Sequence, residues 1–259
     1  MDEILFENTP PVAVVTINRP DENNLLSPDS LNRLGEIVDE LNKDDTIHAV
    51  VITGTVGKFF SAGLLNPDTR SAMTKEAVVS YVMKANRILD ALEALPQIVI
   101  CAINGDFIAG AVEIALACDI RLVADDAIMM CPEVKWGGFP GAGGPVRLPA
   151  IVGRGRALEI IATGRPVDAT EMAQLGIVEA IHPRDKVLAE AVALAHRIAE
   201  NGPRATRGAK RIVNARLAPG FAAARTLSDT LRSELEWSSD VDEGIAAAKE
   251  GRKPDFTQS

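Results

Sequence analysis

Two short, nearly continuous runs of β-branched and aliphatic residues flank one amphipathic segment near the N-terminus. The runs cover residues 12–17 and 49–53, and each has the length of an ordinary buried strand. Between them, residues 28–42 repeat apolar side chains at helical spacing, with Ser27 placed to cap the helix and Pro28 in its first turn. A strand that is apolar on both faces needs cover on both, so this order predicts an α/β fold.

The alternation of strands and helices continues along the chain. Further strands are expected at residues 98–103, 120–123, 128–131 and 177–181, and further helices at residues 71–94, 109–118, 186–200, 204–216, 220–237 and 240–250. Since the last third is almost entirely helical, we expect a strand-rich core over residues 1–190 and a helical region over residues 191–259.

Charge and composition exclude several classes of protein. The 259 residues carry a formal net charge of -9, which argues against nucleic-acid binding driven by counterion release, and only 4% are aromatic. The most apolar stretch, residues 98–123, is interrupted by Asn104, Asp106, Glu113 and Asp119, so it is a poor membrane span. We therefore expect a globular protein that binds neither nucleic acid nor membrane.

The cysteines and the N-terminus indicate a cytoplasmic protein. Cys101, Cys118 and Cys131 are odd in number and form no C-x-x-C pair, which is typical of a reduced intracellular chain. The first residues have neither a basic segment nor a long apolar run, so no secretory signal is expected.

Most familiar catalytic motifs are missing from the sequence. The three histidines, His48, His182 and His196, have no metal-ligand spacing, and no G-x-S-x-G elbow occurs. The glycine-rich segment 137–144 lacks the Gly-Lys-Ser/Thr ending of a P-loop, so we interpret it as a tight turn whose backbone amides help to shape a site.

Two acidic residues are candidates for proton transfer. Glu113 lies in an apolar helix, where a carboxylate must be paired, protonated or directed into a pocket, and a bond to a backbone amide is as good an interpretation as a functional role. Glu133 follows Pro132 after a short strand, and its position alone favours an acid on the surface. Two carboxyl groups in one apolar pocket would suit acid–base chemistry, but the sequence does not show that they meet.

A basic cluster lies near residue 207. Its members are Arg204, Arg207, Lys210, Arg211 and Arg216, and basic residues recur at Arg252-Lys253. Arg204, Arg207 and Arg211 share one helix face. A solvated face is the usual interpretation of such a cluster, and a phosphate-rich ligand is the sharper alternative.

Segments along nearly the whole chain carry a resemblance to one family. They are Val14–Pro20, Asn24–Leu26, Val50–Gly54, Phe60–Gly63, Ala102–Gly105 with Gly110 and Glu113, Cys131–Glu133, Pro140–Gly144, Glu243–Ile245 and Arg252–Phe256. In this order and spacing they resemble the enoyl-CoA hydratase/isomerase (crotonase) superfamily. The resemblance implies a spiral of ββα turns, an acyl-CoA thioester substrate, and no metal or redox cofactor.

The resemblance also implies an assembly. In this family a helical C-terminal region packs into trimers, which are often paired as hexamers. An apolar stripe on the C-terminal helices, formed by Leu227, Leu231, Leu235 and Trp237, is consistent with such an interface.

By position in the family motifs, several residues would bind the substrate. The backbone amides of Leu64 and Gly110 would hold the thioester oxygen, where negative charge grows as an enolate forms. The resemblance places Ala62, Gly63 and Lys253 among the substrate-binding residues.

The two acids acquire roles from the same resemblance. In the hydratase branch of the family two glutamates hold a water molecule and move protons, and they correspond here to Glu113 and Glu133. Glu113 would activate the water, Glu133 would exchange the proton at the α carbon, and the amide of Gly141 would help to hold the water. Since both acids are present, we expect hydration of a 2-enoyl-CoA.

Some positions depart from the family pattern, and they bear on CoA affinity and acyl specificity more than on the chemistry. They are Asp21, Leu65, Ala109, Ala111 and Ala248, and Asn66-Pro67 after Leu65 is placed to start a helix. The alternatives are an enoyl-CoA isomerase, which would depend mainly on Glu133, a dehydratase of a substituted 3-hydroxyacyl-CoA, or a non-catalytic acyl-CoA-binding protein. RNA binding is a further alternative, against which the net charge argues.

Overall fold

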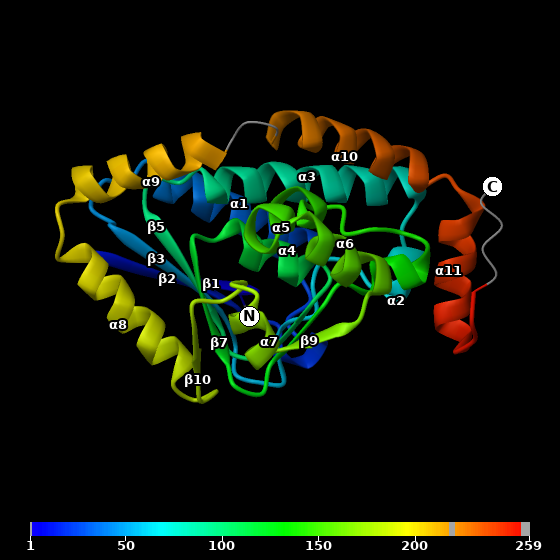
Figure 1. Ribbon diagram of the computed structural model, residues 1–259, viewed down its shortest axis with the longest axis horizontal. Coiled ribbons are helices and arrows are strands. Elements are labelled where there is room, and N and C mark those ends of the chain that lie inside the picture. The colour runs from blue at the N-terminus through cyan, green and yellow to red at the C-terminus, as the bar shows by residue number, and fades with distance from the viewer. Residues whose placement is uncertain (1, 218–220, 255–259) are drawn as a thin grey trace.

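Two sheets form the centre of the protein, in a computed structural model that describes residues 2–217 and 221–254 (Figure 1). The larger sheet has the order β1-β2-β3-β5-β7-β10 and the smaller one the order β4-β6-β8-β9. Their strands are β1 (Ile4–Thr9), β2 (Val12–Ile17), β3 (Ala49–Gly54), β4 (Phe59–Ser61), β5 (Ile98–Ile103), β6 (Asp106–Ile108), β7 (Ile120–Ala124), β8 (Ile128–Met130), β9 (Pro166–Asp168) and β10 (Ala180–His182).

The two sheets are joined by a repeated ββα unit. In three successive units the first strand, β3, β5 or β7, enters the large sheet, and the second, β4, β6 or β8, enters the small one. Equivalent strands of neighbouring units pair in parallel. Helices follow the second strands, so each unit advances the chain by one turn of a spiral. The predicted α/β fold with ββα turns is therefore confirmed.

The helices cover the sheets and extend over one side of the molecule (Figure 1). They are α1 (Pro28–Leu41), α2 (Pro67–Ser71), α3 (Lys75–Glu93), α4 (Gly110–Ala117), α5 (Gly144–Val152), α6 (Arg154–Thr163), α7 (Ala169–Gln174), α8 (Val187–Ala199), α9 (Pro203–Leu217), α10 (Phe221–Leu235) and α11 (Ser239–Glu250). Short 3-10 helices occur at Pro20–Glu22 (η1) and Pro132–Trp136 (η2). Within the described ranges, no helix combines the length and the apolar character that crossing a bilayer requires.

Local sequence signals set several helix boundaries. The Ser27 hydroxyl accepts a hydrogen bond from the Ser30 amide at the start of α1, and the Asn66 side chain accepts one from the Thr69 amide at the start of α2. Both predicted caps are therefore confirmed. The helix expected over residues 71–94 is wrong in its first part, because the chain ends α2 at Ser71 and begins α3 only after Thr74 caps it.

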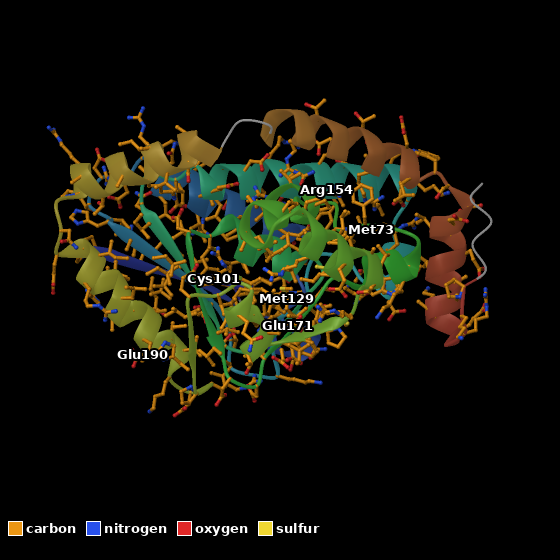
Figure 2. All side chains as sticks on the ribbon, in the orientation of Figure 1. Met73, Cys101, Met129, Arg154, Glu171 and Glu190 are labelled. Atoms are coloured by element: carbon orange, nitrogen blue, oxygen red, sulfur yellow. The ribbon has the colours of Figure 1, made fainter. Side chains whose placement is uncertain are left out.

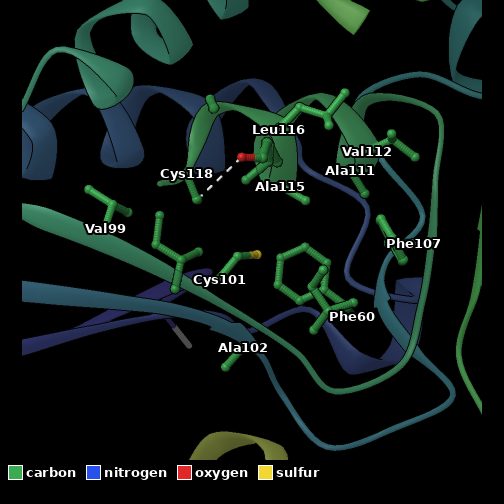
Figure 3. Close-up of a cluster of buried hydrophobic side chains, with 14 of the residues drawn as sticks. Phe60, Val99, Cys101, Ala102, Phe107, Ala111, Val112, Ala115, Leu116 and Cys118 are labelled. Carbon is green, nitrogen blue, oxygen red and sulfur yellow. Dashed lines mark hydrogen bonds between the residues drawn. The ribbon is translucent and has the colours of Figure 1, made fainter. Parts of the chain in front are cut away.

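The core lies between the large sheet and helix α4. Phe60, Cys101, Phe107 and Ala111 pack there, each no more than 1% exposed (Figure 3). The Cys118 thiol donates a hydrogen bond to the Ile114 carbonyl oxygen, and all three cysteines are buried and unpaired. The charged side chain of Glu190, on α8, is exposed instead (Figure 2).

The C-terminal helices fold back over the spiral. Helix α8 packs against β3 and β5, α10 lies along α3, and α11 packs against η2 and α2 (Figure 1). The division expected at residue 190 stays a prediction, and α8 spans it. Asp255 and Phe256 of the tail motif, and the side chains of Leu227 and Leu231, lie outside the described part of the chain.

Two members of the basic cluster anchor α9 to the body. The Arg207 guanidinium pairs with Asp45, and the buried Lys210 ammonium lies 2.7 Å from Asp119 and 2.9 Å from the Gln97 carbonyl oxygen. For these two residues the interpretation as a solvated face is wrong, because acceptors on the edge of the sheet approach the helix.

Candidate active site

The carboxyl ends of three strands of the small sheet, β4, β6 and β8, lie close together. Leu64 follows β4, Gly110 follows β6, and Glu133 follows β8. Because the three strands are parallel neighbours, their carboxyl ends lie at the same edge of the sheet. Leu64, Gly110, Glu113, Glu133 and Gly141 all line one pocket there. The structure therefore brings the predicted catalytic residues together from segments far apart in the sequence.

The backbone turns at Gly63 and Gly110 approach each other closely. A Cβ atom on Gly63, whose φ is +97°, would lie 2.6 Å from the Ile108 carbonyl oxygen and 2.8 Å from the Gly110 amide nitrogen. A Cβ atom on Gly110 would lie 2.5 Å from Cγ of Leu64. Gly110 is the first residue of α4, so its N–H has no partner inside the helix. An N–H donor without an intrahelical partner at a helix N-terminus suits a developing negative charge.

Ala109 holds the turn before α4 in a strained conformation. Its φ is +54° and its ψ is -125°, a region that glycine enters freely and alanine rarely. Its amide donates to the Met130 carbonyl oxygen at 2.9 Å, which ties the turn to β8. The turn therefore places Gly110 at the cost of local strain.

Glu113 lies at the base of the pocket. It is 2% exposed, and its Oε1 accepts a hydrogen bond of 2.8 Å from the Gly144 amide. Burial raises the pKa of Glu113 to about 7, although the Gly144 amide and the nearby Arg147 oppose the shift. The interpretation as an acid bonded to a backbone amide is confirmed, and the carboxyl group also lines the pocket, where its functional role stays a prediction.

Glu133 is not the surface acid that its local sequence favours. The 3-10 helix η2 turns its side chain into the pocket, because Pro132 ends the extended backbone of β8. Its Oε2 is buried and has no hydrogen-bond partner among the described residues. Burial, and then the negative charge of Glu113, raise the pKa of Glu133 to about 8. The two acids therefore interact electrostatically in one pocket.

Two arginines, Arg147 and Arg225, pack against the glycine-rich segment 137–144. The Arg147 guanidinium lies 2.6 Å from Asp90, and the Arg225 guanidinium lies 2.6 Å from the same carboxylate. Gly143, with φ at +116°, has room for no Cβ atom because Arg147 Nη1 would lie 2.0 Å away. This ion-paired support fixes the turn whose Gly144 amide reaches Glu113.

The walls of the pocket are mostly apolar. They include Leu65, Val82, Ala109, Trp136, Phe139, Ala142, Val241 and Ile245, together with the polar or charged Asn66, Arg70 and Arg232. Sequence reasoning missed the two arginines. Neither belongs to a recognisable motif, and they come from α2 and α10, so only the tertiary fold brings them together.

The remaining predicted residues lie outside this lining. Ala62 and Gly63 precede Leu64 in the chain, and Gly63 abuts the Gly110 amide. Lys253 lines a separate surface hollow that it shares with Lys135 and Arg252. The structure thus places Gly63 beside the site and Lys253 apart from the pocket that holds the two acids.

Comparisons with known proteins identify the family. Residues 7–259 match the enoyl-CoA hydratase/isomerase family. A putative enoyl-CoA hydratase/isomerase of Bacillus subtilis is 37% identical over 97% of both chains, and a short-chain-enoyl-CoA hydratase of Clostridium acetobutylicum is 31% identical over 98% of this chain and 97% of its own.

Solved structures give the same result. The crystal structure of an enoyl-CoA hydratase from Mycobacterium avium subsp. paratuberculosis superposes with a TM-score of 0.88, at 28% identity over 99% of each chain. That of an enoyl-CoA hydratase from Bacillus anthracis superposes with a TM-score of 0.80, at 34% identity over the whole of both chains. From its sequence, its spiral fold and its pocket, the chain belongs to the enoyl-CoA hydratase/isomerase family.

Proposed function

We propose that the protein is an enoyl-CoA hydratase, a lyase that reversibly adds water across the 2,3 double bond of a 2-enoyl-CoA thioester. One observation carries the proposal: Glu113 and Glu133, both with raised pKa values, line one largely apolar pocket beside Gly110. Relatives named as short-chain-enoyl-CoA hydratase and crotonyl-CoA hydratase, at 31% and 32% identity, support it.

In the proposed mechanism the two acids divide the proton transfers. The ionised Glu113 carboxylate takes a proton from the water molecule while the water oxygen bonds to the β carbon. Protonated Glu133 gives a proton to the α carbon. The higher pKa of Glu133 suits the acid and the lower pKa of Glu113 suits the base. One shared proton in the pair provides this state near neutral pH.

The remaining parts of the site would bind the thioester and the water. The amides of Leu64 and Gly110 would stabilise the negative charge on the thioester oxygen, each by roughly 3 kcal/mol in the transition state. Gly141 lines the pocket with both acids, where its amide would help to hold the water. The thioester itself makes the α carbon acidic, so the proposal needs no metal or redox cofactor.

The proposal is tested with Glu113→Gln and Glu133→Gln. Each variant should fold and bind acyl-CoA, yet lose at least ~100-fold in the rate at which a short 2-enoyl-CoA loses its conjugated absorbance. Glu190→Gln, a change of the same type on the exposed face of α8, is the control and should keep the wild-type rate.

The outcomes separate the alternatives. Loss of activity in Glu133→Gln alone would favour an isomerase, and a double-bond shift assay would then detect turnover. A wild-type protein that binds 2-enoyl-CoA without turning it over would contradict the hydratase proposal and leave an acyl-CoA-binding protein.

We also propose that the protein acts as a cytoplasmic trimer or pair of trimers. Ile212 and Val213 on α9 are 73% and 56% exposed, and Trp237 after α10 is 57% exposed, so large apolar side chains on the C-terminal helices are open to a partner subunit. The three unpaired cysteines support a reducing compartment. Light scattering that finds a stable monomer at micromolar concentration would contradict the assembly.

A further inference from the structure

Two arginines stand in the wall of a pocket that is otherwise suited to a hydrocarbon chain. Arg70 comes from the end of α2 and Arg232 from the end of α10, and their side chains are only 11% and 10% exposed. Helices α2, α10 and α11 approach one another at one end of the molecule (Figure 1). The stem of Arg232 also lies against Gly141, where an added Cβ atom would be 2.9 Å from its Cδ. Arg232 is therefore close to the proposed water site.

The acidic partners of these arginines do not balance their charge. Both guanidinium groups pair with Glu236, which is fully buried and lies 2.8 Å from Arg232. Asp242 lies 3.7 Å from Arg70, but it is 56% exposed and bonds to Lys75 at 2.8 Å. Lys75 and Asp242 therefore balance each other. Glu133 also faces Arg232, but it is protonated in the proposed mechanism, so Arg70 and Arg232 share the single buried carboxylate of Glu236 and one positive charge remains at this end of the pocket.

The hydrogen-bonding capacity of the two arginines is also incompletely used. Arg70 Nε and Arg232 Nη1 are buried, and neither has a hydrogen-bond acceptor among the described residues. A buried donor without an acceptor is costly, and the cost is larger when the donor is charged. An anionic ligand in the pocket would supply acceptors and also neutralise the excess charge.

We propose that the acyl group of the substrate carries a carboxylate at its far end, which Arg70 and Arg232 bind. The substrate class is then the CoA monothioester of a 2-enedioic acid, and this inference rests on the proposed hydratase function. The arginines line the same pocket as Glu113 and Glu133, so a group that reaches them belongs to the acyl chain rather than to the nucleotide of CoA. Arginine suits this task because its planar group binds a carboxylate through two parallel hydrogen bonds.

The first experiment uses the wild-type protein alone. Hydration is measured with hex-2-enedioyl-CoA, with its ω-methyl ester, and with hex-2-enoyl-CoA, which share the reacting bond and differ at the far end. We expect kcat/KM for the free acid to exceed that for the other two by at least ~100-fold, because a site built for a polar group rejects analogues without it. Hexanedioyl-CoA, which cannot be hydrated, should likewise inhibit more strongly than hexanoyl-CoA.

The second experiment tests the two arginines. Arg70→Gln and Arg232→Gln should each reduce the ratio of kcat/KM between hex-2-enedioyl-CoA and hex-2-enoyl-CoA at least ~10-fold, and Arg70→Lys, which keeps the charge, should reduce it less. Arg33→Gln, on the surface of α1, is the matched control and should leave the ratio unchanged. Circular dichroism establishes that each variant is folded.

The results distinguish this inference from the proposed function. A wild-type enzyme that hydrates hex-2-enoyl-CoA as well as the diacid overturns the inference and leaves the hydratase function intact. Absence of turnover with every substrate overturns the proposed function. Equal losses on both substrates in the arginine variants, with a displaced pH profile, would show that the arginines tune Glu133 rather than bind a carboxylate, and would also overturn the inference.

Discussion

The two sides of helix α4 belong to regions of opposite character. Toward the large sheet, Ala111 and Ala115 pack with Phe60 and Cys101 in a purely apolar core (Figure 3). Toward the pocket, the same helix carries the buried acid Glu113. All eight residues of the helix are buried, so the two sides differ in chemistry and not in depth.

The pocket side contains features that reduce the stability of the fold. Ala109 is strained, Glu113 and Glu133 are removed from water, and Gly110 has no room for a Cβ atom. The core side contains no such feature at Phe60 or Cys101. Such costs gather at functional sites because the surrounding structure can hold them in place. Substitutions on the two sides should therefore affect different properties of the protein.

The largest effect is expected in the core. Phe60→Ala removes a fully buried ring from the centre of the cluster and should lower the free energy of unfolding by about 3–5 kcal/mol. Urea titration followed by circular dichroism measures the change. Val56→Ala, at a side chain that is 88% exposed, is the control and should change it by less than ~0.5 kcal/mol. A loss below 1 kcal/mol at Phe60 would contradict the distinction between the two sides.

The next effect concerns the backbone amide of Gly110. Gly110→Ala and Gly110→Pro both bring a Cβ atom against Leu64, but only proline removes the N–H. We expect the proline variant to have a kcat at least ~100-fold below that of the alanine variant, the size of a lost oxyanion-hole donor. Equal activities in the two folded variants would show that packing, and not the donor, matters at this position.

The two acids should make the stability of the protein depend on pH. Their pKa values are raised in the folded chain from 4.5, so the folded state holds more protons than the unfolded state above that pH. The stabilisation that comes from their neutral forms is complete below pH 4.5. It is lost as the pH rises through the folded-state pKa values of about 7 and about 8.

The Glu113→Gln, Glu133→Gln double variant removes this loss. It should melt above the wild type at pH 8.5 by at least ~3 °C, the shift that ~1 kcal/mol gives in a chain of this length, and the difference should nearly vanish at pH 4, below the unfolded pKa of 4.5. Scanning calorimetry at both pH values measures it. A constant difference at the two pH values would indicate a packing effect of the amides and not a titration.

The smallest effect is expected at the strained turn. Ala109→Gly relieves a backbone strain of about 1–3 kcal/mol and loses about 0.5–1 kcal/mol to the greater freedom of glycine in the unfolded chain. The net stabilisation should be about 1 kcal/mol in urea titration. Ala111→Gly, at the second residue of α4 and without positive φ, should destabilise the protein and serves as the control. Destabilisation by Ala109→Gly would contradict the strain.

The features that could be predicted from sequence are those with a local cause. Strand β3 is buried at every residue, so its composition alone identifies it, and the caps at Ser27 and Asn66 depend on residues only three positions apart. Strands β1, β4, β6 and β9 are missing from the prediction. The last three have only three residues each and include a polar or proline residue, whereas the equally short β8 is predicted because it lies in an unbroken apolar run. Strand β10 begins at Ala180 rather than 177, since the preceding turn buries Ile177 and Val178 without strand pairing.

Residues of the site could be predicted only where a motif or the family resemblance includes them. The family pattern indicates Glu133 as a catalytic acid, whereas its local sequence favours a position on the surface. The turn of η2 that directs its side chain inward leaves no periodic signal in the sequence. The pairing of Arg70 with Arg232 through Glu236 joins segments more than 150 positions apart, and no local rule connects them.

The pocket draws its walls from Leu64 to Ile245, and this has a consequence for the chain during its synthesis. A ribosome that has translated the three ββα units has already made both acids and both proposed donor amides. Arg232, Val241 and Ile245 are made later, so a nascent chain at that stage has its reactive groups open to water and no closed acyl compartment. Substrate selection therefore begins only after α10 and α11 have been made and have docked.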